Sequence, residues 1–152
     1  MSSTRNADDL MAKMAHNQAH LFQQASSDDL PSYSFIKMFL CSRQTEELDK
    51  LVLVSDDEIY VPIKARIKKR GVVLPENTMH WIGYMYRCLS YLYDVSSRSL
   101  LRLVPPKYLV SVYPSYHALD PRKAAARIKE ERFKDGQSDL ERTLSLMKKL
   151  YL

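Results

Sequence analysis

The stretch WIGYMYRCLSYLYD, residues 81–94, decides how this chain folds. Apolar side chains recur in it at spacings of three and four residues, which places them on one face of an α-helix. We expect this helix to run from about Thr78 to Asp94 and to line the core. Its expected core-facing residues are Trp81, Met85, Cys88, Leu89 and Leu92.

Helical patterns continue on both sides of this stretch. The chain has only three glycines and is rich in Leu, Ala, Lys, Arg and Glu, a composition that favours helices over tight hairpins. We therefore expect an all-α fold, a single compact domain of about six to seven helices over residues 8–152, after a disordered tail of residues 1–7. Stop and capping signals divide the further helices, which are expected at 8–25, 32–50, 96–103, 107–113, 120–134 and 138–151.

Residues 51–63 allow two interpretations. The apolar runs 51–54 and 59–61 could pair as a β-hairpin across the polar residues between them. Ser55 and Glu58 also form a capping box, which is typical of a helix N-terminus and precedes isoleucines at helical spacing. Pro62 counts against a regular helix. We favour the helix, because the pattern continues to Arg70 before Gly71 stops it.

Composition narrows the cellular setting. The chain is 45% hydrophobic and 27% charged, as is ordinary for a globular protein, and it lacks the run of about 20 apolar residues that a membrane helix needs. Its N-terminus has no apolar core of a secretory signal. Cys41 and Cys88 lie far apart, without the spacing of metal ligands. We expect a cytoplasmic protein with no membrane association.

Charge is distributed unevenly along the chain. Residues 1–60 hold 5 Lys or Arg against 10 Asp or Glu, whereas residues 61–152 hold 18 against 8. Basic helical faces can neutralise phosphates, so one hypothesis is a nucleic-acid-binding regulator. The residues that would make those contacts are Lys64, Lys68, Lys69, Arg70, Arg122, Lys123 and Arg127.

Aromatic side chains point to a protein partner instead. Seven of the ten tyrosines fall between Tyr84 and Tyr116, and Tyr and Arg are enriched at the energetic centres of interfaces. Helical spacing groups several of them on a face away from the core side. The predicted partner-binding residues are Tyr84, Tyr86, Arg87, Tyr91, Tyr116 and His117.

Candidate catalytic and metal-binding residues are few. His16 and His20 have the i, i+4 spacing of two metal ligands, but no third ligand follows at a useful distance, so we interpret them as part of an exposed polar face. His117 and Asp120 are better explained by a helix boundary that Asp120 caps than by acid–base chemistry. Cys88 should be buried and unreactive. We expect a non-enzymatic protein that uses no metal and no cofactor.

Three motifs together resemble a known protein family. They are WIGYMYR at 81–87, SSR at 96–98 and YPSYHALDP at 113–121, with looser agreement at 124–128. The chain resembles small bacterial proteins commonly encoded beside ADP-ribosyltransferase-like toxin genes, in loci of toxin–antitoxin type. The resemblance implies that residues 57–70 are helical and that the protein binds and restrains a cognate toxin. It leaves the oligomeric state open.

Overall fold

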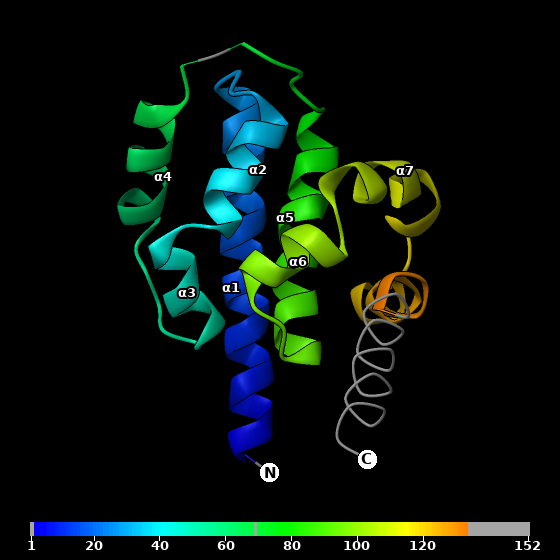
Figure 1. Ribbon diagram of the computed structural model, residues 1–152. Coiled ribbons are helices and arrows are strands. Elements are labelled where there is room, and N and C mark those ends of the chain that lie inside the picture. The colour runs from blue at the N-terminus through cyan, green and yellow to red at the C-terminus, as the bar shows by residue number, and fades with distance from the viewer. Residues whose placement is uncertain (1, 69, 134–152) are drawn as a thin grey trace, which may run out of the picture.

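Two long helices form the centre of the molecule. The computed structural model describes residues 2–68 and 70–133, and within them it contains eight helices and no strand. Helices α1 (Ser2–Ser27) and α5 (Glu76–Tyr93) lie side by side through the middle (Figure 1). The predicted all-α, single-domain fold is therefore confirmed over the described residues.

The shorter helices surround this central pair. Figure 1 shows α3 and α4 on one side of the pair, and α7 with the helix that follows it on the other. The shorter helices are α2 (Ser32–Leu40), α3 (Arg43–Asp49), α4 (Asp56–Arg66), α6 (Ser97–Leu103), α7 (Pro106–Tyr116) and a helix at 121–133.

The close approach of α1 and α5 depends on one glycine. A Cβ atom at Gly83 would lie 2.7 Å from Cγ of Phe22 and 2.9 Å from the backbone oxygen of Gln18. Both distances are shorter than real van der Waals contacts, so any larger residue would force the two helices apart. Gly83 thus sets the distance between the two helices that contact each other more extensively than any other two of the helices α1–α7 do.

Aromatic rings fill the core beside this helix pair. Phe22 from α1 meets Phe35 and Phe39 from α2 at ring-centroid distances of 5.3 Å and 4.9 Å, both in edge-on geometry that suits the ring quadrupoles. From α5, Met85 and Leu89 are fully buried. Of the other core residues predicted in α5, Cys88 is also buried, whereas Trp81 and Leu92 are only half-buried.

Serine caps explain three helix starts. The side chains of Ser42, Ser55 and Ser96 each accept a hydrogen bond from the backbone N–H three residues later, at the starts of α3, α4 and α6. Because Ser55 caps a helix, residues 56–66 are helical and the hairpin interpretation is wrong. Asp120 likewise accepts a hydrogen bond from the N–H of Arg122 at 2.9 Å and begins the helix at 121–133, as predicted.

Three helices end at a residue that adopts the left-handed backbone conformation although it is not glycine. Asp29, Leu51 and Asp94 have positive φ angles of 59°, 63° and 51° and follow α1, α3 and α5. In each case the next residue donates its N–H back to a carbonyl five positions earlier, which satisfies a free helix-end acceptor. Asp tolerates this conformation better than Leu does, so Leu51 is the strained position among the three.

Several predicted boundaries are wrong. The helix expected at 32–50 is two helices, because Ser42 caps a new one after Cys41. Helix α1 already begins at Ser2, so residues 2–7 extend a helix rather than form a tail. Adding residues to an existing helix costs far less than starting one.

The other errors concern proline and helix ends. Helix α7 continues past Pro114 to Tyr116, and the N–H of His117 donates to the Tyr113 carbonyl oxygen at the end of this last turn. Helix α4 stops at Arg66 rather than at Arg70. The helix predicted at 138–151 lies outside the described residues. Among the helices in the described part of the chain, none is both long and apolar enough to cross a membrane.

Candidate functional site

A groove with a cavity volume of about 500 Å³ opens between α1, α5 and α7. We call it the aromatic–histidine groove. Its walls carry several aromatic rings and histidines, and part of its lining comes from α7, which lies beside the central helix pair (Figure 1). The lining residues are His16, Gln23, Asn77, His80, Trp81, Tyr84, Tyr113, His117 and Pro121.

Helix α5 supplies one wall through regular spacing. Asn77, His80, Trp81 and Tyr84 follow one another at i, i+3, i+4 and i+7, which aligns them on one face of the helix. Each of the last three is half-buried, so each presents part of its ring to solvent. The wall is therefore rigid, because it stands on a helix whose opposite side is packed in the core.

Helix α7 supplies the facing wall. The rings of Tyr113 and His117, one turn apart, stack with centroids 4.5 Å apart and planes inclined by 20°. Nδ1 of His117 lies 2.7 Å from the Tyr113 carbonyl oxygen, which fixes the imidazole over the phenol ring. Trp81 meets Tyr113 edge-on at 5.6 Å across the groove. Three rings from two helices thus form one connected aromatic surface.

All four histidines of the chain gather here. His16, His80 and His117 line the groove, while His20 packs edge-on against His80 at 5.5 Å. His16 packs in the same way against Tyr84, at 5.2 Å. Burial, and to a lesser extent the neighbouring His20 and His16, lowers the pKa of His80. This imidazole therefore stays neutral to lower pH than an ordinary histidine, and its nitrogens can both donate and accept hydrogen bonds.

Nearby ionisable groups also remain neutral. Burial raises the pKa of the Tyr84 phenol, so it keeps its proton and can donate it in a hydrogen bond. Burial also raises the pKa of the Cys88 thiol, to about 12, which removes the thiolate that a nucleophile needs. Within the described residues, no group of three or more His, Cys, Asp and Glu side chains could hold a metal ion. The arrangement suits recognition by stacking and hydrogen bonding.

Two of the six predicted partner-binding residues, Tyr84 and His117, line the groove. Two others lie outside its lining and have partners on the protein itself. The Tyr91 hydroxyl donates to Asp8 at 2.9 Å, and that of Tyr116, which is buried, donates to Glu131. Of these four residues, only Tyr84 and His117 therefore line this groove.

The remaining two predictions, Tyr86 and Arg87, are corrected by their burial. The exposed fraction of the side chain is 0% for Tyr86 and 1% for Arg87, so neither can touch a partner. The Tyr86 hydroxyl donates to the backbone oxygen of Val104 at 2.6 Å. Tyr84 and Tyr86 are two positions apart on a helix, which places them about 200° apart around its axis and explains their separate fates.

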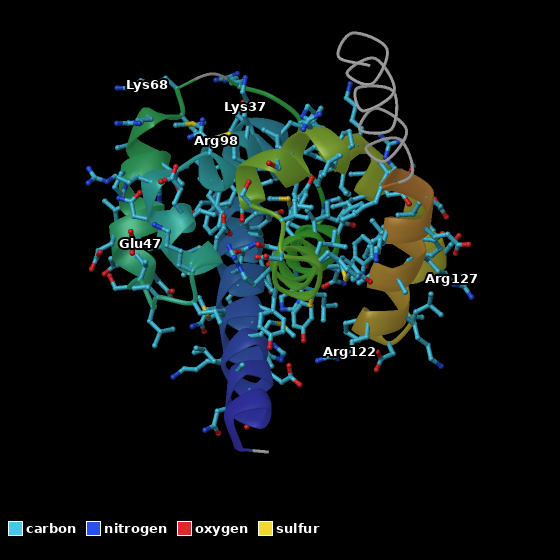
Figure 2. The ribbon with its side chains drawn as sticks, turned by 60° about the horizontal axis from the view of Figure 1, so that its bottom comes forward. Lys37, Glu47, Lys68, Arg98, Arg122 and Arg127 are labelled. Atoms are coloured by element: carbon cyan, nitrogen blue, oxygen red, sulfur yellow. The ribbon has the colours of Figure 1, made fainter. Side chains whose placement is uncertain are left out.

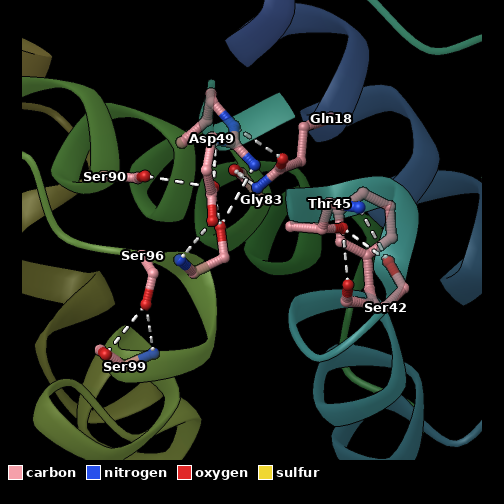
Figure 3. A network of polar contacts seen from close by, with 11 residues as sticks. Gln18, Ser42, Thr45, Asp49, Gly83, Ser90, Ser96 and Ser99 are labelled. Carbon is pink, nitrogen blue, oxygen red and sulfur yellow. Dashed lines mark hydrogen bonds and ion pairs between the residues drawn. The ribbon is translucent and has the colours of Figure 1, made fainter. Parts of the chain in front are cut away.

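Arg87 is the centre of a buried polar network, and Figure 3 shows its partners Gln18 and Asp49. Its guanidinium donates to Asp49 at 2.7 Å, to Gln18 at 3.1 Å and to Ser97 at 3.2 Å. Asp49 also accepts hydrogen bonds from the backbone N–H and the hydroxyl of Ser97, and from Ser90. The network joins α1, α3, α5 and α6. Burial lowers the pKa of the Arg87 guanidinium, and the nearby Asp49 carboxylate opposes that shift.

The predicted nucleic-acid-binding residues fall into two separate places. Lys68 lies on the side of α4, whereas Arg122 and Arg127 lie on the opposite side of the molecule (Figure 2). Lys64 is paired with Asp28 at 3.3 Å, and Arg122 with Asp8 at 3.5 Å.

The remaining members of this set are varied in their surroundings. The Arg127 guanidinium lies over the Tyr116 ring, 5.9 Å from its centroid. Arg70 and Lys123 are exposed, and Lys69 lies outside the described residues. The predicted basic residues at 64–70 and at 122–127 therefore do not form one continuous basic surface.

Most of the groove was not predicted from the sequence. His16, Asn77, His80 and Tyr113 are not among the site residues that the sequence predicts, and it predicts Trp81 in the core. One signal was available, since the spacing of 77, 80, 81 and 84 already places these residues on one helical face. The contribution of α1 and α7 could not be read in this way, because it depends on tertiary packing.

Comparison of the chain with protein-family models, with curated proteins and with solved structures returns no match.

Proposed function

We propose that this chain is an interaction protein whose aromatic–histidine groove receives a segment of a partner protein. The observation that carries the proposal is the gathering of Trp81, Tyr84 and Tyr113 around one opening to solvent. Trp and Tyr dominate the energetic centres of protein interfaces, because they bury a large apolar area and keep a polar tip. The groove suits a partner segment that inserts an apolar side chain and offers hydrogen bonds at its edges.

Rigidity of the walls supports the same function. The two helices that carry the aromatic rings are packed against the core, and the rings contact one another directly. A surface that is already ordered loses little conformational entropy when a partner binds. Less of the binding energy is therefore lost in ordering the groove, and more of it contributes to affinity.

We further propose that the partner is a toxin, which the chain restrains by binding without chemistry of its own. The resemblance of residues 81–121 to proteins encoded beside ADP-ribosyltransferase-like toxin genes supports this identity. The groove would then cover a surface that the toxin needs for its activity.

Co-expression with the product of the neighbouring gene tests both statements. Cells that produce both proteins should grow, and the two should co-purify at a fixed ratio through size-exclusion chromatography. The double variant Tyr113→Ala with His117→Ala removes the stacked pair from the groove rim and should abolish both effects. Lys107→Ala, an exposed change on the same helix, should abolish neither. A folded double variant that still protects and co-purifies would exclude the groove as the binding site.

A nucleic-acid-binding regulator is the second candidate. Lys68 and Arg70 favour it, because both are exposed and neither has an ion pair among the described residues. This function requires that affinity for DNA fall steeply with salt, and that Lys68→Ala with Arg70→Ala make the dependence shallower. Absent or salt-insensitive DNA binding would exclude it.

A further inference from the structure

A second groove, of about 510 Å³, opens between α2, α3 and α4. Two of the helices that line it, α3 and α4, lie on the opposite side of the central helix pair from α7, which lines the aromatic–histidine groove (Figure 1). Its charged lining residues are Lys37, Arg43 and Arg66, and no acidic residue lines it. We call it the basic groove.

The three cations come from three different elements. Lys37 belongs to α2, Arg43 begins α3 and Arg66 ends α4. All three are exposed, and none has a carboxylate within ion-pair distance among the described residues. Figure 2 shows Lys37 on the same side of the molecule as Lys68 and Arg98, away from Arg122 and Arg127. The fold thus concentrates positive charge that is not neutralised internally.

The sequence alone does not reveal this concentration of positive charge. Residues 1–60 are acidic overall and contain only 5 Lys or Arg, yet two of these line the basic groove. Some acidic side chains of this segment pair with cations elsewhere in the protein: Asp28 pairs with Lys64, and Asp49 with Arg87. The local charge of the groove therefore differs in sign from that of the segment that supplies most of its lining.

The floor between the cations is aliphatic. Met38, Ile59, Pro62 and Ile63 line it, and the two isoleucines are buried members of the core. No aromatic ring lines the groove, so a nucleic-acid base would find nothing on which to stack. An aliphatic floor inside a ring of positive charge fits a ligand that carries an apolar group between negative ones.

We propose that the basic groove binds an acidic peptide segment of a partner protein, which inserts an aliphatic side chain between its carboxylates. Arg43 and Arg66 can each bind a carboxylate with two parallel hydrogen bonds, and Lys37 adds a third positive charge. The Gln44 side chain, which also lines the groove, can hydrogen-bond the peptide backbone. This site is independent of the proposed toxin-binding groove, so either assignment can fail alone.

The test is a titration followed by fluorescence anisotropy, with a labelled synthetic peptide of alternating acidic residues and leucines as the probe. The double variant Lys37→Glu with Arg66→Glu should raise the dissociation constant at least about tenfold. The control variant Lys13→Glu with Lys107→Glu changes the net charge equally at exposed sites outside the groove and should raise it by about twofold or less. Equal weakening in both variants would overturn the proposal.

Two further arms separate the aliphatic and nucleic-acid contributions. A peptide with serine in place of leucine should bind more weakly to the unaltered protein, and equal affinity would overturn the inserted side chain. A single-stranded oligonucleotide of equal charge should not displace the peptide; displacement that depends on Lys37 and Arg66 would reassign the groove to nucleic acid.

The methyl resonance of Met38 should shift with the leucine peptide in the unaltered protein, which keeps the proposal testable if a variant misfolds. An unshifted resonance would contradict it.

Discussion

Side chains on helix α5 lie in two different environments. On one face, Trp81 and Tyr84 open to solvent and line the aromatic–histidine groove. Tyr86, about 200° further around the helix from Tyr84, and Arg87, which is one turn from Tyr84 but hydrogen-bonds to α1 and α3, are closed into the interior. Residues close together in the sequence therefore line an open groove in one case and form part of the buried interior in the other.

The difference shows that residue type alone does not identify an interface. Tyr and Arg are equally at home in a binding site and in a satisfied buried network, because both carry long apolar parts and strong hydrogen-bonding groups. What separates them here is the available partner. Arg87 finds a carboxylate, an amide and a hydroxyl inside the protein, whereas Tyr84 has solvent on one side. Changes on the two faces should accordingly affect different properties.

The largest effect is expected at Arg87. Arg87→Ala leaves the Asp49 carboxylate, which has an exposed side-chain fraction of 15%, without its cation, and breaking a buried pair in this way costs about 3–5 kcal/mol. Urea unfolding followed by circular dichroism would measure the loss. Arg102→Ala, an exposed change on α6, should stay within about 0.5 kcal/mol of the unaltered protein. A similar small change at Arg87 would show that the buried network does not stabilise the fold.

A smaller loss is expected at the contact between α1 and α5. Gly83→Ala gains helix propensity of about 1 kcal/mol, but the new Cβ meets Phe22 at 2.7 Å and a backbone oxygen at 2.9 Å. Because the backbone cannot move aside as a side-chain end can, overpacking should win, with a net loss of about 1–3 kcal/mol. The midpoint of urea unfolding measures the sign directly. A stabilised variant would mean that the two helices are not held at this distance.

The two environments on α5 can be compared most closely by removing one tyrosine hydroxyl from each. Tyr86→Phe deletes the hydrogen bond to Val104 and should cost about 0.5–1.5 kcal/mol, while leaving partner binding intact. Tyr84→Phe has no such internal bond to lose among the described residues and should change only the affinity for the partner. Thermal unfolding and a binding titration on both variants would test this. Equal changes in stability and in affinity for the two variants would contradict the distinction between the two environments.

The smallest effect is expected from pH. The pKa of His80 is lowered in the folded protein from its ordinary value of 6.5, so the unfolded chain binds this proton more tightly. The resulting stability is present above that value and declines as the pH falls through 6.5 toward the lowered pKa. Urea midpoints at about pH 7.5 and about pH 5.5 should differ less in His80→Gln than in the unaltered protein. An equal difference would assign the pH dependence to other groups.

Much of the fold was predictable because its signals are local. Helical periodicity identified α5, and the caps at Ser55, Ser96 and Asp120 identified three helix starts. The break at Ser42 is also local, but it interrupts an apolar pattern that continues on both sides of it. The continuing apolar pattern therefore predicts one helix where there are two.

Little of the site was predictable, because its parts are distant in the sequence. His16 reaches Tyr84, and Trp81 reaches Tyr113, only through the packing of α1 and α7 on α5. The partners of Arg87 are equally remote, since Gln18 and Asp49 lie far before it in the chain. A pattern within one helix reveals its faces but does not say which face a neighbour will cover.

The central claim is that the open face of α5, and not its buried face, meets the partner. Trp81 tests it most directly, because it is the only tryptophan in the chain and lines the groove. Fluorotryptophan incorporated into this chain alone gives one fluorine resonance, recorded before and after addition of the product of the neighbouring gene. The account predicts that this resonance shifts on formation of the complex and shifts less with Tyr113→Ala and His117→Ala present. A complex that forms with the resonance unmoved would contradict it.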